Sequence, residues 1–218
     1  VINFKKNEDI HIRFKGFRLE REIVGMIYKI GVPSMIMQAI GSVMTYGMNL
    51  ILISFTPTAT AVFGVYFKLQ SFIFMPVFGL NNGLVPILAY NYGAGRRDRF
   101  IQAMKCAILY AVCIMVIGVV IFQTIPAVLL GFFEASDEML RIGVPALRVI
   151  CISFLPAAFG IVCGTAFQAL GNAVYSMFVS IARQLVVLLP AAYLLALSGE
   201  VTYVWWAFPI AEVMSLAM

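Results

Sequence analysis

Histidine is almost absent from this sequence: His11 is the only one in 218 residues. It lies in a polar N-terminal stretch, outside every long apolar run. This excludes an H-E-x-x-H zinc site and a Ser/His dyad within an apolar segment. The phosphate-binding motif G-x-x-x-x-G-K-[ST] is also missing, which excludes nucleotide hydrolysis by that motif. We therefore expect a protein that is not an enzyme and that carries no cofactor and no metal.

Charge is scarce as well. Only 11% of the residues are charged, whereas 62% are hydrophobic; soluble domains have about 25% and 45–50%. No charged residue falls between Leu69 and Gly95 or between Cys106 and Phe133, and a helix needs roughly 20 apolar residues to cross a bilayer. Backbone groups in lipid must be hydrogen-bonded within the segment, so these spans are expected to be helices. The sequence predicts an all-α integral membrane protein.

Turn residues and charged loops divide the chain into six expected transmembrane helices. The expected spans are 22–55, 59–92, 100–122, 139–170, 175–197 and 201–218, the last of them cut short, after a polar and basic linker at 1–21. Thr56-Pro57-Thr58 is expected as a turn, because proline lacks an N–H and clashes with the preceding helical turn. Residues 131–138 are expected as an acidic loop. Both ends of the sequence are expected to be cuts within a longer protein.

The net charge of +5 is concentrated at two places, the linker and the Arg96–Arg99 loop. Basic clusters at the ends of spans are typical of cytoplasmic loops, and we prefer this interpretation to nucleic-acid binding. Two spans separate the clusters, so both are expected on the cytoplasmic side. The loops near residues 58, 134–138 and 200 are then expected on the other side.

A polar stripe runs along the first expected span. It consists of five residues that fall within an arc of about 80° on a helix: Ser34, Gln38, Ser42, Thr45 and Asn49. Such a stripe faces either a neighbouring helix, through interhelical hydrogen bonds, or a water-filled pathway. The sequence leaves both interpretations open.

Four ionisable side chains lie within or near the spans. Lys68 is set well inside the second span, where an ammonium costs ~2.5 kcal/mol or more. Glu212 is the only carboxylate within any expected span. Buried charges normally pair, because an unpaired one keeps its whole desolvation cost. We expect Glu212 to pair with Lys68, Arg148 or Arg183.

Prolines and glycines within the spans mark expected bending points. Pro76, Pro156 and Pro190 are candidate hinges, and Gly79 and Gly83 follow Pro76 in the segment GLNNG. Broken helices are where transporters build sites and hinges. The pairs at 79/83 and 160/164 also have the small-xxx-small spacing of close helix packing.

The segment from Gly79 to Gly95, GLNNGLVPILAYNYGAG, is followed directly by the Arg96–Arg99 loop. Together with IGVP at 30–33 and AFQALGN at 166–172, it resembles the MATE (multidrug and toxic compound extrusion) family, in particular its MepA-like bacterial branch. The resemblance covers nearly the whole chain, aligned to the family's second half. It implies one lobe of a twelve-helix, two-lobe transporter in the bacterial inner membrane. Such a protein exchanges Na⁺ or H⁺ for an outgoing amphipathic organic cation, and the N-terminal lobe would be the partner.

A substrate-binding surface is expected on the polar stripe and its neighbours. Its candidate residues are Gln38, Ser42, Thr45, Asn49 and Lys68, with apolar contact from Met35, Tyr46 and Phe74. Methionine and aromatic walls suit varied ligands because methionine repacks easily. The same residue types also occur in plain helix packing.

This sequence departs from the family pattern at the coupling acids. NorM-type members carry a Glu at the position of Gly41 and an Asp in the fourth helix, where no acid lies between Val149 and Gly171. We therefore expect the coupling ion to bind mainly in the missing lobe, with Glu212 as the alternative. A lipid-linked precursor flippase, whose cationic groove would need Lys68, Arg148 and Arg183, and a non-transporting membrane subunit are the alternative functions.

Overall fold

The computed structural model describes residues 20–218, and this part of the chain is helical, with no strand. Its elements are α2 (Arg21–Ile53), α3 (Pro57–Gly93), α4 (Arg97–Thr124), α5 (Pro126–Gly131), α6 (Asp137–Ile150), η1 (Cys151–Ser153), α7 (Phe154–Ala169), α8 (Ala173–Ile181), η2 (Ala182–Leu188), α9 (Leu189–Ala196), α10 (Val201–Val204) and α11 (Ala207–Ala217). The all-α fold predicted from the sequence is confirmed. The linker at 1–21 lies almost wholly outside the described residues, so its role stays a prediction.

Five helical stretches of the described chain are long and apolar enough to cross a bilayer. They are α2, α3, α4, the stretch Asp137–Ala169 and the stretch Ala173–Ala196. Helices α10 and α11 add a shorter apolar stretch, Val201–Ala217. All six begin and end within a few residues of the expected spans, because apolar runs and turn residues are local features of the sequence.

Two local expectations about loops were wrong. Pro57 is not in a turn but is the first residue of α3, where the missing N–H costs nothing. Thr56 caps this helix, since its Oγ1 accepts a hydrogen bond of 3.1 Å from the Ala59 N–H. Gly131 likewise closes the short helix α5 instead of opening the acidic loop.

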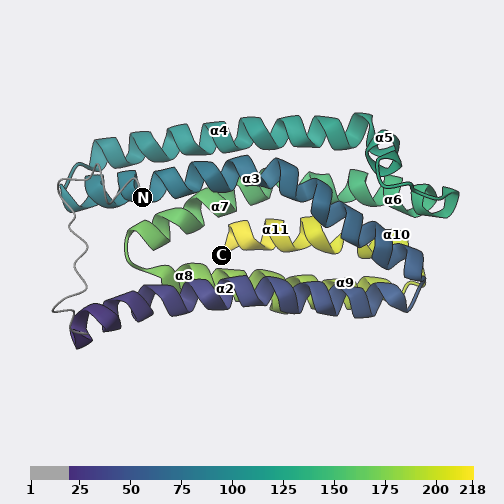
Figure 1. Ribbon diagram of the computed structural model, residues 1–218, viewed down its shortest axis with the longest axis horizontal. Helices are drawn as coiled ribbons and strands as arrows, with labels where there is room; N and C mark the ends of the chain where they lie inside the picture. The colour runs from purple at the N-terminus through teal and green to yellow at the C-terminus, as the bar shows by residue number, and fades with distance from the viewer. Residues whose placement is uncertain (1–19) are drawn as a thin grey trace, which may run out of the picture.

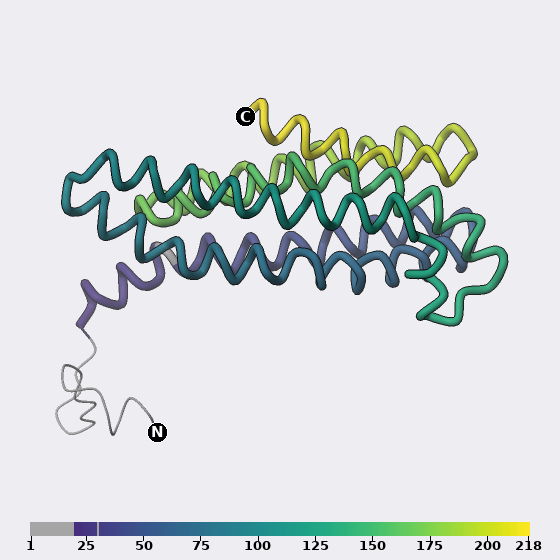
Figure 2. The backbone as a smooth tube through the Cα atoms, turned by 90° about the horizontal axis from the view of Figure 1, so that it is seen from above, coloured from purple at the N-terminus to yellow at the C-terminus, as the bar shows by residue number. Residues whose placement is uncertain are grey.

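The spans form an elongated bundle with two sides. In Figure 1, α2, α8 and α9 run along one side and α3, α4 and α7 along the other, with α11 between them. The contacts agree: α2 packs on α8 and α9, α3 packs on α4 and α7, and α11 packs on η2 and α7. Figure 2 shows that the spans share one long axis. A region near the middle of the bundle is thus bordered by α2, α3, α7, η2 and α11.

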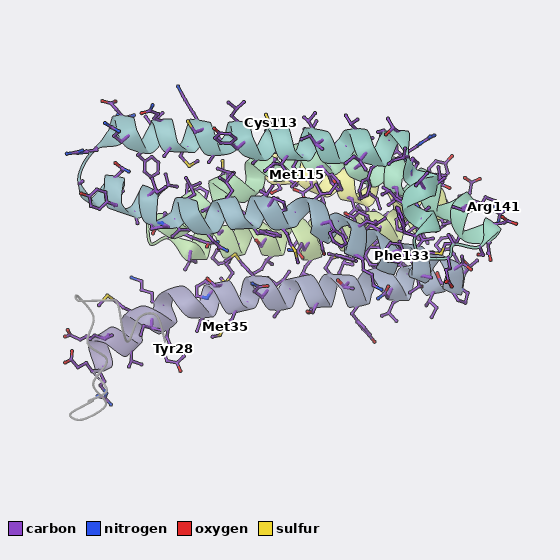
Figure 3. The ribbon with its side chains drawn as sticks, turned by 45° about the horizontal axis from the view of Figure 1, so that its top comes forward. Tyr28, Met35, Cys113, Met115, Phe133 and Arg141 are labelled. Atoms are coloured by element: carbon purple, nitrogen blue, oxygen red, sulfur yellow. The ribbon has the colours of Figure 1, made fainter. Side chains whose placement is uncertain are left out.

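The buried core is apolar and aromatic. Trp205, Phe63 and Phe154 are almost fully buried, and the Phe63 ring centroid lies 6.3 Å from that of Trp205. Figure 3 shows the contrast along α4, where Met115 is buried and Cys113 lies on the outer side.

The closest helix approaches occur at glycines outside the expected pairs. A Cβ at Gly47 would lie 2.8 Å from Leu189, and one at Gly118 would lie 2.6 Å from Ile73. A Cβ at Gly79, Gly83 or Gly160 meets nothing within 4 Å among the described residues. The 79/83 pair therefore marks no close helix contact within residues 20–218. Gly164 does lie against α8, since its carbonyl oxygen accepts a hydrogen bond of 2.8 Å from Ser176 Oγ and a Cβ there would lie 3.8 Å from that atom.

Two spans are interrupted beside expected hinges. The 3₁₀ turn η1 separates α6 from α7, three residues before Pro156, and the π-helix η2 separates α8 from α9, two residues before Pro190. Pro76 lies inside α3, which Figure 1 shows to be bent. A π-helix replaces i→i−4 hydrogen bonds by i→i−5 bonds and is frequent at functional sites.

Candidate functional site

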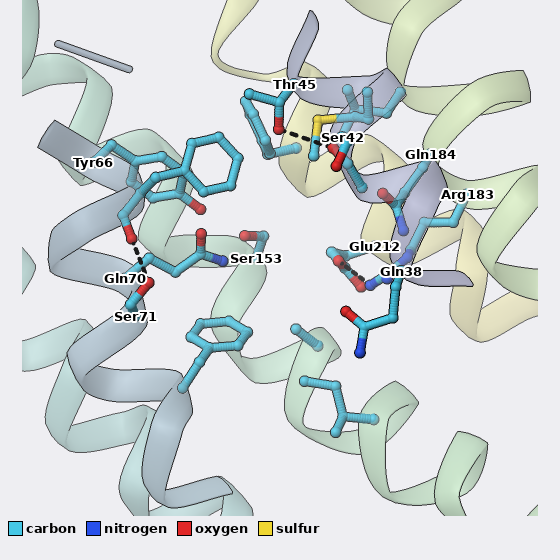
Figure 4. Close-up of a pocket in the computed structure, with 18 of the residues that line it drawn as sticks. Gln38, Ser42, Thr45, Tyr66, Gln70, Ser71, Ser153, Arg183, Gln184 and Glu212 are labelled. Atoms are coloured by element: carbon cyan, nitrogen blue, oxygen red, sulfur yellow. Dashed lines mark hydrogen bonds and ion pairs between the residues drawn. The ribbon is translucent and has the colours of Figure 1, made fainter. Parts of the chain in front are cut away.

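A cavity of about 760 Å³ opens in the middle of the bundle. Its walls come from α2, α3, η1, α7, η2 and α11, so every side of the bundle contributes. Figure 4 shows its polar side chains converging from opposite walls. These polar lining residues are Gln38, Ser42, Thr45, Asn49, Gln70, Ser71, Ser153, Arg183, Gln184 and Glu212.

The α2 wall is the polar stripe. Gln38, Ser42, Thr45 and Asn49 all line the cavity. Thr45 donates a hydrogen bond of 2.9 Å from Oγ1 to the Gly41 carbonyl oxygen of its own helix. In the described part of the chain, the side chains of the other three have no hydrogen-bond partner. These four residues of the stripe therefore face a cavity, and the side chains of Gln38, Ser42 and Asn49 form no hydrogen bond with a neighbouring helix within residues 20–218.

The α3 wall contains residues that were not among the candidates. Gln70 and Ser71 line the cavity together with Tyr66, Phe74 and Phe78. Ser71 donates from Oγ to the Phe67 carbonyl oxygen at 2.8 Å, whereas the Gln70 amide points into the cavity. The signal for Gln70 was present, because it lies four residues before Phe74 and thus on the same helix face.

Tyr46 and Phe74 line the cavity, but two other candidates lie elsewhere. Lys68 places its Nζ 5.7 Å from the centroid of the Phe133 ring, a cation–π contact at the α5–α6 end of the bundle. At 100° per residue, Lys68 points about 120° away from the middle of the cavity-lining face of α3. Met35 precedes the lining stretch of α2 and is 66% exposed (Figure 3).

One ion pair lies at the cavity wall. Arg183 Nη1 on η2 contacts Glu212 Oε1 on α11 at 2.6 Å, and the two side chains are 24% and 16% exposed. Of the three partners considered for Glu212, the structure selects Arg183. Lys68 contacts Phe133 instead, and Arg148 is exposed on α6, a helix that contributes no residue to the cavity lining.

The remaining polar wall comes from the two helix interruptions. Ser153, the last residue of η1, donates from Oγ to the Ile150 carbonyl oxygen at 2.6 Å, and Gln184 follows Arg183 in η2. Sequence reasoning missed both residues, because 3₁₀ and π turns have no reliable local pattern. Within residues 20–218, no three His, Cys, Asp or Glu side chains gather in a group that fits a metal ion. The cavity can thus bind through amides, hydroxyls, aromatic faces and a single carboxylate.

Comparison with known proteins gives consistent matches. The family model MatE matches residues 33–194. The multidrug export protein MepA of Staphylococcus aureus (strain bovine RF122 / ET3-1) is 27% identical over 213 residues, which are 97% of this chain and 47% of that protein. MepA of Staphylococcus haemolyticus is 26% identical, over 95% of this chain and 46% of that protein. The chain thus spans about half the length of the curated relatives it matches.

Solved structures share the fold. An outward-facing multidrug resistance MATE family transporter of the MOP superfamily superposes with a TM-score of 0.89 at 21% identity, over 99% of this chain and 50% of that one. A MOP superfamily transporter from Pyrococcus furiosus gives a TM-score of 0.90, also at 21% identity and with the same coverage. The described chain therefore has the architecture of one half of these structures.

Proposed function

The chain belongs to the MatE family, and from this premise we propose that it is one lobe of a secondary antiporter. The complete protein would export amphipathic organic cations across a bacterial inner membrane in exchange for Na⁺ or H⁺. The relatives of similar sequence are named as multidrug export proteins, and this chain spans about half of their length. A second lobe would therefore complete the cavity.

The observation that supports the proposal best is the composition of the cavity wall. The cavity volume of about 760 Å³ falls within the range of about 300–1,000 Å³ that is typical of small-molecule sites. Aromatic rings of Tyr46, Phe74 and Phe78 border the same space as the amides of Gln38 and Gln70, which have no hydrogen-bond partner within residues 20–218. Aromatic faces attract cations and amphipathic rings, and the amides accept or donate hydrogen bonds in many poses.

Energy for export would come from an ion gradient. Gly41 lines the cavity at the position where NorM-type members carry a Glu, so this wall lacks that acid. Glu212 is the one carboxylate among the lining residues. We keep the proposal that the coupling ion binds mainly in the other lobe, with Glu212 as the alternative.

Alternating access would use the interruptions in the helices. Pro156 and Pro190 follow η1 and η2, which carry Ser153 and Arg183 into the cavity wall. Pro76, Gly79 and Gly83 lie in the bent helix α3, where no described side chain packs against the two glycines. Bending at these points would move the cavity residues that these helices carry.

The proposed topology places the Arg96–Arg99 loop in the cytoplasm, by the positive-inside rule. The acidic loops lie at the opposite end of the bundle (Figure 1). There the Thr58 hydroxyl donates to Glu138 Oε2 at 3.0 Å, which ties the start of α3 to the start of α6.

The proposal is tested by ethidium efflux from cells that express the complete reading frame, with and without an ionophore that collapses the cation gradient. Efflux that stops with the gradient supports a secondary antiporter. Efflux that persists without a gradient contradicts it. A protein that is present in the membrane but gives no efflux would favour the flippase or the non-transporting subunit. The flippase has less structural support, because only Arg183 of its three required cations lines the cavity.

A further inference from the structure

Arg183 and Glu212 are the two charged side chains among the residues that line the cavity. They stand on η2 and α11, two elements that pack directly on each other. Because their charges cancel, this wall presents no net charge to a ligand. A cation that enters the cavity cannot form its own ion pair with Glu212 unless Arg183 moves away from that carboxylate.

The contact between the two side chains is one that a ligand can replace. It consists of a single N–O distance of 2.6 Å, whereas a guanidinium and a carboxylate can form two parallel hydrogen bonds. Both side chains retain exposed surface toward the cavity. The pair is therefore neither locked by bidentate geometry nor sealed in the core.

Two glutamine side chains could replace Glu212 as hydrogen-bond acceptors for the Arg183 guanidinium. Figure 4 shows Gln38 beside the Arg183–Glu212 pair and Gln184 next to Arg183. Neither glutamine side chain has a hydrogen-bond partner in the described part of the chain, so two amide oxygens are available as acceptors. An Arg183 that leaves Glu212 would thus keep hydrogen-bond acceptors for its charge, which lowers the cost of separating the pair.

The backbone under Arg183 is also unusual. Arg183 is the second residue of the π-helix η2, and both Arg183 and the next residue, Gln184, line the cavity. Such segments are rare and concentrate at functional sites. The position of Arg183 is therefore set by a local distortion and not by a regular α-helical ladder.

We infer that Arg183 is a built-in counter-ion that occupies Glu212 until an organic cation replaces it, and that this exchange makes Glu212 a specificity-determining residue for cations. The inference rests on the proposed function and deepens it. In the exchange, the ligand cation takes the Glu212 carboxylate while its apolar part contacts Phe74 and Phe208, and Arg183 turns to the Gln38 or Gln184 amide oxygen. Competition with Arg183 weakens cation binding and so favours release. Ligands without charge gain nothing from the exchange.

A purely structural role predicts a different pattern. If the pair only ties η2 to α11, then removing either partner loosens the same cavity wall, and both single variants weaken ligand binding alike. If Arg183 competes with the ligand, the two variants have opposite effects. The sign of the change therefore separates the two roles.

The test measures the Kd of ethidium for the purified product of the complete reading frame, by ethidium fluorescence. We expect Arg183→Gln to lower the Kd about tenfold, because Glu212 is left for the ligand alone, and Glu212→Gln to raise it about tenfold, in the range of common coupling effects. The double variant is expected between the two. Lys68→Gln removes a cation outside the cavity lining and serves as the matched control, with an unchanged Kd.

Every outcome decides the question. Changes of the same sign, or no change, in Arg183→Gln and Glu212→Gln overturn the counter-ion role while the proposed function stands. A wild-type protein that neither binds nor exports ethidium overturns the proposed function itself. If Arg183→Gln does not fold, Arg183→Met, which keeps an apolar stem of similar reach, replaces it, and a Kd that is equal to or higher than that of the wild type refutes the inference.

Discussion

Gln123 on α4 donates a hydrogen bond of 2.9 Å from Nε2 to the carbonyl oxygen of Arg148 on α6. The same nitrogen lies 3.2 Å from Cys151 Sγ, the first residue of η1. The side chain of one span thus bonds the backbone of another at the point where α6 passes into the 3₁₀ turn. Ser153, the last residue of this turn, lines the cavity, so the Gln123 hydrogen bond connects α4 to an element of the cavity wall.

Replacing Gln123 should therefore destabilise the lobe. We expect Gln123→Leu to lower the free energy of unfolding by about 0.6 kcal/mol, the average measured for interhelical hydrogen bonds in membranes, and by no more than about 1.7 kcal/mol, the maximum measured. The measurement is the apparent melting temperature of the detergent-solubilised protein. Gln102→Leu, a change near the start of α4 at an exposed position, is the matched control. Equal melting temperatures for the two variants would contradict a role for the Gln123 bond.

Gly118 should tolerate no larger side chain. A Cβ there would lie 2.6 Å from Ile73 Cγ2, between two closely packed helices. We expect Gly118→Val to cost about 1–3 kcal/mol through overpacking. In Gly160→Ala the added carbon meets nothing within 4 Å, so stability is expected to stay close to that of the wild type. The check is again thermal unfolding, and a stable Gly118→Val protein would show that α3 and α4 are less tightly packed than the structure has them.

The cavity-lining amides should matter more than the candidates outside the cavity. Gln38→Ala and Gln70→Ala remove cavity-lining amides from opposite walls. Each is expected to raise the Kd for ethidium several-fold, since each hydrogen bond lost to the ligand is worth about 0.5–1.5 kcal/mol. Met35→Ala is expected to leave the Kd unchanged, because Met35 lies outside the lining. Titration of the three purified variants decides the matter, and a larger effect at Met35 than at Gln38 would mean that the ligand binds elsewhere.

The proposed topology can be checked with single cysteines in a background without the four native ones. Arg99→Cys is expected to react with a membrane-impermeant maleimide only after cells are opened, because the Arg96–Arg99 loop is placed in the cytoplasm. Glu200→Cys, in the loop between α9 and α10, is expected to react in intact cells. The reverse pattern would invert the orientation of every helix. Reaction of both sites in intact cells would refute a six-span lobe.

Several features of this fold could be predicted because they are properties of short stretches of chain. The spans followed from apolar runs long enough to cross lipid, and the polar face of α2 followed from the spacing of Gln38, Ser42, Thr45 and Asn49. The positions of Pro57 and Gly131 were misassigned at the level of one turn, since a proline can either end a helix or begin one. What decides between these is the cap on the preceding residue, here Thr56.

The pairing of charges depended on how the helices pack, which no local sequence pattern predicts. The sequence identified Glu212 as a carboxylate in need of a cation but left Lys68, Arg148 and Arg183 equal as partners. The pairing with Arg183 follows from the contact of η2 with α11, while the orientation of α3 turns Lys68 toward Phe133. Composition and periodicity thus determined that the chain is helical, where its spans lie and which face of α2 is polar, because the bilayer acts on each segment by itself. Only the tertiary structure decided which charges meet and which side chains share the cavity, because those distances depend on how segments far apart in the sequence pack against each other.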